Sequence, residues 1–179
     1  CERLLNALNH FLPEDIAVQD CREVPMDFHA RYSCLGKEYI YKIWNAPYMN
    51  PFYEGLAWFF PYRLDEEQLS FVGEEFKGMH DFGGFTSFCT SDARDRGDMC
   101  RTVTRAGIQR DGGLVTFTVA ADGFLYNMVR IMVGTLLYVA QGKLQPEQIP
   151  EILAARDRTA AGPTAPPCGL YLNRVFYGE

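Results

Sequence analysis

One arginine interrupts the most apolar stretch of this chain, and its chemistry raises the first question about function. Residues 124–140 fit a helix that is apolar on every side, and Arg130 carries their only charge. A guanidinium cannot lose its proton at physiological pH, so burying it without a partner costs several kcal/mol or more. We therefore expect either an anionic partner for Arg130 or a cleft that its head group faces.

The residue types that usually bind metals are present, but their spacing does not match a metal site. None of the six cysteines forms a C-x-x-C pair, and the three histidines form neither an H-x-x-x-H nor an H-x-E arrangement. This spacing predicts no metal site. No secretory signal is recognisable, so we expect reduced thiols and a cytoplasmic location.

Composition sets the size and class of the fold. The 179 residues and 47% hydrophobic content are enough for one well-buried core, and the formal net charge of -6 gives no general attraction to nucleic acid. The apolar run at 124–140 is shorter than the ~20 residues that cross a bilayer, so we expect no membrane association. Because the chain starts at Cys1 inside what reads as a helix, we also expect a fragment that lacks its N-terminal part.

Periodicity places strands and helices around this run. An amphipathic helix opens the chain, and residues 15–24 are expected to form a strand. From Lys37 onward the period is two, which places Tyr39 and Tyr41 on one face of a second strand. The remaining elements are expected at 56–60 (strand), 65–79 (helix), 89–100 (surface loop), 101–109 and 114–121 (a hairpin), 146–156 (helix) and 170–177 (strand). This order predicts an α+β domain with a mostly antiparallel sheet covered by helices, of which residues 65–177 form the most complete unit.

Several motifs are spread along the chain. They are Phe28-His29-Ala30-Arg31-Tyr32-Ser33 with Lys37-x-Tyr39-x-Tyr41-x-Ile43, Asp81-Phe82-x-x-Phe85-Thr86-Ser87-Phe88, Phe124-x-x-x-Met128-Val129-Arg130-x-x-Val133-Gly134, Asp157-Arg158-Thr159, and Ala165-Pro166-Pro167-x-Gly169-Leu170-Tyr171-Leu172. In combination, these motifs resemble the tRNA pseudouridine synthase A family over almost the whole chain. Residues 1–179 are then similar to the C-terminal part of its catalytic domain, the later half of the pseudouridine synthase fold.

The resemblance implies an isomerase that acts on tRNA. Enzymes of this family convert uridine to pseudouridine in the anticodon arm: they break the bond from ribose to N1 of uracil and rejoin the sugar to C5, without a metal or organic cofactor. The family carries its catalytic aspartate in an Arg-Thr-Asp-x-Gly-x-His-Ala run. That run is absent here, because the similar pair Arg158-Thr159 is followed by Ala160. We therefore expect this chain by itself to be inactive.

The resemblance also implies roles for particular side chains. Arg130 would pair with the absent aspartate and keep it ionised and oriented, and Tyr39 would lie beside the flipped uracil. Arg31, just before that strand, is expected to bind the substrate through a phosphate. The resemblance further implies a homodimer whose two chains build the RNA cleft together. Other cations expected near phosphates are Lys37, Lys42, Arg94, Arg96, Arg101 and Arg105.

Other interpretations fit the same residues. By residue type alone, Tyr39 fits a core tyrosine with a satisfied hydroxyl, and Arg130 fits one half of a structural ion pair. The chain would then be a non-catalytic α+β RNA-binding or dimerisation module. A third alternative is a small-molecule enzyme that binds a carboxylate or phosphate at Arg130 in a closed polar pocket. The catalytic hypothesis predicts Arg130 and Tyr39 at one open cleft, whereas an ion pair between Arg130 and an internal acid such as Asp122 would contradict it.

Overall fold

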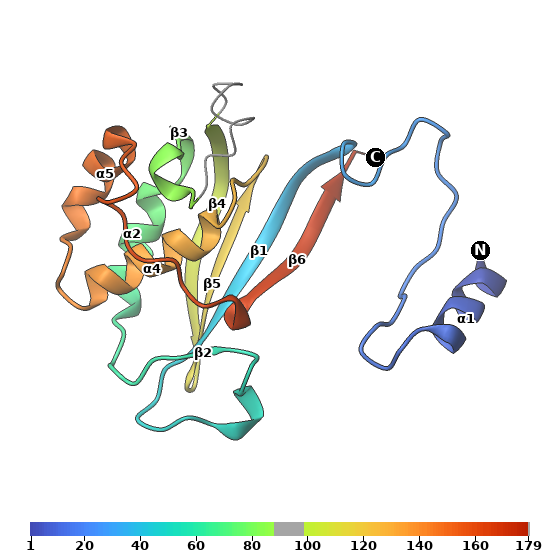
Figure 1. The fold of residues 1–179 in the computed structure, drawn as a ribbon, viewed down its shortest axis with the longest axis horizontal. Helices are drawn as coiled ribbons and strands as arrows, with labels where there is room; N and C mark the ends of the chain where they lie inside the picture. The colour runs from blue at the N-terminus through green and yellow to red at the C-terminus, as the bar shows by residue number, and fades with distance from the viewer. Residues whose placement is uncertain (88–98, 179) are drawn as a thin grey trace. The chain divides into compact units, whose positions relative to one another are not determined.

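The computed structural model describes residues 1–87 and 99–178 and divides the chain into two compact units, Cys1–Cys34 and Leu35–Glu179 (Figure 1). The first unit contains helix α1 (Glu2–Phe11), which confirms the expected opening helix. The strand predicted at 15–24 is wrong, because Asp15 lies in a turn and residues 16–24 form no regular secondary structure. The side chain of Asn9 instead takes both backbone groups of Val18, with Asn9 Nδ2 donating to the carbonyl at 2.8 Å and Oδ1 accepting from the amide at 2.7 Å.

The second unit is built on a sheet that the described residues form from six strands. These strands are β1 (Cys34–Trp44), β2 (Trp58–Phe59), β3 (Gly78–Asp81), β4 (Cys100–Asp111), β5 (Leu114–Ala121) and β6 (Leu170–Tyr177). The order is β2-β1-β5-β4-β3, and β6 also pairs with β1 (Figure 1). The β1–β5, β5–β4 and β4–β3 pairs are antiparallel, while β2 is parallel to β1. The predicted mostly antiparallel sheet is therefore confirmed.

Helices α2 (Glu66–Glu75), α4 (Met128–Ala140) and α5 (Ile149–Ala155) gather on one side of this sheet (Figure 1). The core lies between the helices and the sheet. The strand residues that face the helices are apolar and buried, including Tyr41 and Ile43 on β1 and Phe117 on β5. None of the described helices has the length and apolar character that a membrane span requires.

The ends of two predicted helices differ from the expectation. Asp65 caps α2 as its position suggests, with Oδ1 accepting the amides of Glu67 and Gln68. The helix predicted to reach residue 79 ends at Glu75, and Met79 lies on β3 with 74% of its surface exposed. Gly78, at φ +99°, takes a backbone conformation outside the helical region, so the helix cannot continue to Met79. Met79 has the spacing of a buried helical residue in the sequence, but it does not belong to the helix.

Helix α4 begins later than its apolar run. The run starts at residue 124, but Asn127 has φ 61° and ψ 7°, in the left-handed region, so the helix starts at Met128. Arg130 consequently lies in the first helical turn rather than two turns into the helix. This position matters because the N-terminus of a helix carries a partial positive charge, which disfavours a second positive charge and favours an anion.

Candidate functional site

Two partners hold the guanidinium of Arg130, and both are neutral. Nε donates to the carbonyl of Ala165 at 2.6 Å, and Nη1 donates to Oδ1 of Asn127 at 2.9 Å. Over residues 1–87 and 99–178, Nη2 and the second hydrogen of Nη1 have no partner. The half-buried arginine therefore keeps one edge of its fork available, in the geometry that binds a carboxylate through two parallel hydrogen bonds.

No acid of the described chain pairs with Arg130. Asp122, the internal acid considered from the sequence, accepts a hydrogen bond from the backbone amide of Thr102 at 3.0 Å instead. Arg110 illustrates the opposite case: it pairs with Glu66 and also donates to Asn45 at 2.9 Å and to the carbonyl of Leu64 at 3.2 Å. Arg110 is engaged as a structural arginine, whereas Arg130 is oriented and has no counter-charge within the described residues.

A chain of polar side chains extends from Arg130 across three segments. Asn127 Nδ2 donates to Ser87 Oγ at 3.1 Å, and Ser87 Oγ lies 3.2 Å from Thr164 Oγ1. Arg158 Nη2 donates to the same Thr164 oxygen at 3.2 Å. The sequence analysis assigned no role to Asn127, Ser87 or Thr164, although Ser87 belongs to one of the motifs, because each is an ordinary polar residue until the fold brings the three segments together.

Tyr39 and Tyr41 share one face of β1 but have different surroundings. Tyr41 is fully buried, and its hydroxyl donates to the carbonyl of Pro166 at 2.7 Å. Tyr39 is half-buried, and its hydroxyl has no hydrogen-bond partner in the described part of the chain. The ring of Tyr39 packs edge-on against Phe124, with centroids 5.0 Å apart and planes at 84°. Tyr41 thus fits a core tyrosine with a satisfied hydroxyl, and Tyr39 does not.

Burial raises the pKa of Tyr39 above its ordinary value, so its hydroxyl stays neutral at physiological pH. Burial also raises the pKa of Tyr41, with a further contribution from the nearby Cys168 thiol, while the positive charge of Arg130 acts in the opposite direction. Arg130 therefore lies near enough to Tyr41 to influence its hydroxyl, while Tyr39 packs against Phe124, which precedes α4 by four residues. Among the described interactions, no hydrogen bond or ring contact joins Arg130 and Tyr39 directly.

The cations expected to contact phosphates lie on different parts of the chain. Arg31 belongs to the unit Cys1–Cys34, where it is exposed and its guanidinium lies 5.7 Å from the ring centre of Tyr32. Lys42 alternates with Tyr41 along β1 and so lies on the opposite face of the sheet, 4.5 Å from the ring centre of Tyr171. Arg105 pairs with Glu38 at 3.2 Å.

The other expected cations divide into three groups. Lys37 lies on β1, Arg101 donates through Nη1 to the carbonyl of Cys100 at 2.5 Å, and Arg94 and Arg96 lie outside the described residues, as does most of the loop predicted at 89–100. Within the described ranges, no group of three or more His, Cys, Asp or Glu side chains is arranged to hold a metal ion.

A family model and several curated proteins that match this chain all carry the description tRNA pseudouridine synthase. The family model described as tRNA pseudouridine synthase matches residues 73–178. The chain is 42% identical to tRNA pseudouridine synthase A of Acetivibrio thermocellus, over 98% of this chain and 70% of that protein. It is 45% identical to the proteins of the same name from Geobacillus kaustophilus, over 99% of this chain and 67% of that protein, and from Bacillus pumilus, over 98% and 70%.

Proposed function

Because this chain belongs to the tRNA pseudouridine synthase family, we propose that it carries the arginine and the tyrosine of a site that isomerises uridine to pseudouridine in the anticodon arm of tRNA. The observation that carries this proposal is Arg130. Its guanidinium is held by two neutral acceptors and presents its remaining fork without an acid of the described chain to meet it. A catalytic aspartate from outside these 179 residues would complete the pair.

The pairing has a chemical purpose. A carboxylate that receives two hydrogen bonds from Arg130 is oriented, and the adjacent positive charge holds its pKa below the usual value, so it stays ionised. An ionised carboxylate is what a nucleophile or base acting on the ribose requires. In the reaction the bond from C1′ to N1 breaks, the bond from C1′ to C5 forms, and the proton lost from C5 is balanced by one gained at N1. No electron acceptor is required.

The reaction also requires a surface on which the flipped base can stack, and Tyr39 can provide it. A uridine that leaves its stack loses a few kcal/mol, and an aromatic ring in the site offsets part of that cost. The ring of Tyr39 is fixed by its edge contact with Phe124, and its hydroxyl has no partner within residues 1–87 and 99–178. We assign Tyr39 to the uracil and Arg31, on the other unit, to a phosphate of the RNA.

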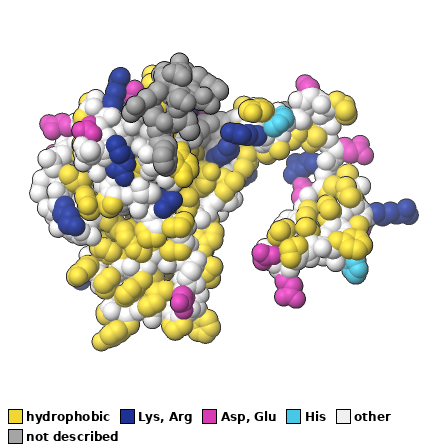
Figure 2. Space-filling view, in the orientation of Figure 1, with side chains coloured by type: hydrophobic (Ala, Val, Ile, Leu, Met, Phe, Trp, Pro, Cys, Tyr) yellow, Lys and Arg dark blue, Asp and Glu magenta, His cyan; other side chains and the backbone are white. Residues whose placement is uncertain are grey.

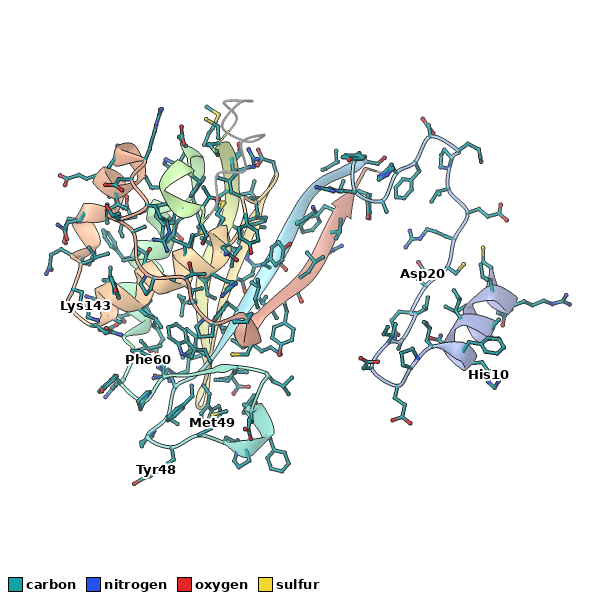
Figure 3. All side chains as sticks on the ribbon, viewed as in Figure 1. His10, Asp20, Tyr48, Met49, Phe60 and Lys143 are labelled. Atoms are coloured by element: carbon teal, nitrogen blue, oxygen red, sulfur yellow. The ribbon has the colours of Figure 1, made fainter. Side chains whose placement is uncertain are left out.

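A homodimer is the proposed assembly, and an exposed apolar surface supports it. Figure 2 shows hydrophobic side chains gathered over the connection from β1 to β2 at the lower end of the sheet. Tyr48 and Phe52 are 84% and 87% exposed there, and Tyr48 projects away from the ribbon (Figure 3). The family resemblance implies that a second copy of the chain covers this surface. The proposed location is the cytoplasm, where tRNA is modified. Light scattering of the chain and of Tyr48→Ser would test this surface.

Nucleoside analysis tests the catalytic proposal. Unmodified tRNA is incubated with this chain alone, with the chain joined to a segment that carries the Arg-Thr-Asp run, and with the same joined protein in which that aspartate is asparagine. We expect pseudouridine only from the joined protein with the intact aspartate. Absence of pseudouridine from all three, with the joined protein folded and bound to tRNA, would instead support the non-catalytic RNA-binding module.

A further inference from the structure

We propose that Asn127 is a positioning residue that fixes the orientation of Arg130; this inference rests on the proposed function. Asn127 uses both ends of its amide: Oδ1 accepts Nη1 of Arg130 at 2.9 Å, and Nδ2 donates to Ser87 Oγ at 3.1 Å. An amide that is bonded at both ends has one preferred orientation, so its oxygen stays turned toward the guanidinium.

The bond from Asn127 adds what the bond to Ala165 cannot supply alone. Nε of Arg130 donates to the carbonyl of Ala165 at 2.6 Å, and a single contact at Nε still allows the planar guanidinium to pivot about that hydrogen bond. The second contact, at Nη1, fixes the guanidinium plane. The free fork then points in one direction before a carboxylate arrives, which avoids an ordering cost when the pair forms.

Two independent requirements select asparagine at position 127. The backbone there is left-handed, at φ 61°, and the residues that adopt this conformation most readily are glycine, asparagine and aspartate. The side-chain contacts require one acceptor and one donor. Glycine supplies neither, and an ionised aspartate supplies only acceptors. Asparagine meets both requirements, whereas glycine and an ionised aspartate do not.

Ser87 has a hydrogen-bond partner of its own, so the position of Asn127 depends on more than the turn in which it lies. Ser87 Oγ lies 3.2 Å from Thr164 Oγ1, and Arg158 donates to that threonine at 3.2 Å and to the carbonyl of Gly162 at 2.8 Å. The orientation of Arg130 is therefore connected to the segment around Thr164 as well as to α4. A network whose members satisfy one another restricts alternative arrangements of the arginine.

The first test measures Arg130 itself in this chain. Nitrogen-15 NMR of the arginine side chains reports the rate of rotation about Nε–Cζ. We expect slow rotation for Arg130 in the wild type and at least tenfold faster rotation in Asn127→Gly, which keeps the left-handed backbone and removes both hydrogen bonds. Asn173→Ala is the matched control, because Asn173 bonds to Glu38 on another part of the sheet. Unchanged rotation in Asn127→Gly would overturn the positioning role.

The second test measures turnover in the complete enzyme. We expect Asn127→Gly to lower kcat about 10- to 100-fold while KM for tRNA stays unchanged, because a misplaced group costs rate rather than RNA affinity. Asn127→Asp should keep slow rotation but also lower kcat, since its carboxylate would occupy Arg130. Faster rotation with an unchanged kcat in Asn127→Gly would show that Asn127 holds Arg130 but would overturn the claim that turnover depends on this positioning. The catalytic role of Arg130 itself is tested separately by Arg130→Ala.

Discussion

Arg130 and Ala165 bond to each other twice, through the side chain in one direction and through the backbone in the other. Nε of Arg130 donates to the carbonyl of Ala165 at 2.6 Å, and the amide of Ala165 donates to the carbonyl of Arg130 at 3.1 Å. Farther along α4, Thr135 accepts the amide of Gly162 at 2.9 Å. The segment 162–165 is therefore fixed along one side of α4, and the placement of Arg130 depends on that contact.

Arg130→Ala should abolish pseudouridine formation in the complete enzyme, because the catalytic carboxylate would lose both its counter-charge and its orientation. Arg130→Lys keeps the charge but not the fork, and we expect it to lose about 100-fold in kcat. Turnover on unmodified tRNA measures both variants. Thermal unfolding is the control, since the lost bond to Ala165 should also lower stability by about 1 kcal/mol. Arg130→Ala that still turns over at the wild-type rate would contradict the proposed pairing.

Substitutions of Tyr39 should separate stacking from hydrogen bonding. Tyr39→Phe keeps the ring and its edge contact with Phe124, whereas Tyr39→Leu removes the aromatic surface. If stacking on the uracil is the main role, Tyr39→Leu should impair kcat/KM more than Tyr39→Phe does, because base stacking on an aromatic ring is worth about 1–3 kcal/mol. Single-turnover assays of the complete enzyme measure the difference. Wild-type activity in Tyr39→Leu would rule out the stacking role.

Gly134→Ala should disrupt the contact between α4 and the 162–165 segment. A Cβ at Gly134 would lie 1.7 Å from the carbonyl oxygen of Pro163, and one at Gly162 would lie 2.4 Å from the backbone of Gly134. Because both partners are backbone, we expect a loss of about 3 kcal/mol in the free energy of unfolding. Gly107→Ala is the matched control, with nothing within 4 Å of its added Cβ. Equal unfolding midpoints in urea for the two variants would show that the segment moves away freely.

Alkaline pH should destabilise the fold through Tyr41. Burial raises its pKa above the ordinary 10.0, so the folded state keeps the phenol proton that the unfolded state releases. The stabilisation is complete below pH 10 and is lost as pH rises above 10, at up to about 1.4 kcal/mol per pH unit. Urea unfolding between pH 8 and 11 should show a smaller decline for Tyr41→Phe than for the wild type. Some decline should remain, because burial also raises the pKa of Tyr39 and of Tyr171. The same decline in both proteins would exclude Tyr41 as a source.

Much of the fold could be predicted from local patterns. The hairpin over residues 100–121 follows from two alternating runs joined by Gly112-Gly113, and the strand at 170–177 follows from its own alternation. The apolar run at 124–140 predicted a buried helix. Each of these signals lies within a few residues of the structure that it predicts, so no knowledge of distant contacts was needed.

Two of the errors come from side-chain contacts that the local pattern does not show. Residues 15–24 are expected to form a strand, but a strand also needs a partner, and here Asn9 takes the backbone of Val18. The helix at 124–140 starts four residues late because Asn127 adopts the left-handed conformation. Its two side-chain bonds, to Ser87 and to Arg130, favour that arrangement, and the first reaches 40 residues along the chain. Side-chain hydrogen bonds that the periodicity of the sequence does not record decided both cases.

The sequence by itself determined which residue could carry chemistry, since a lone guanidinium in an apolar run requires either an anionic partner or a cleft that its head group faces. It could not distinguish Tyr39 from Tyr41, which share a strand face and a residue type. Only the tertiary structure bonded one hydroxyl to Pro166 and left the other without a partner in the described chain. It also held Arg130 between Ala165 and Asn127 with part of its fork unpaired within the described residues. Hydrogen bonds form between atoms that folding brings within about 3 Å, and sequence spacing does not record those distances.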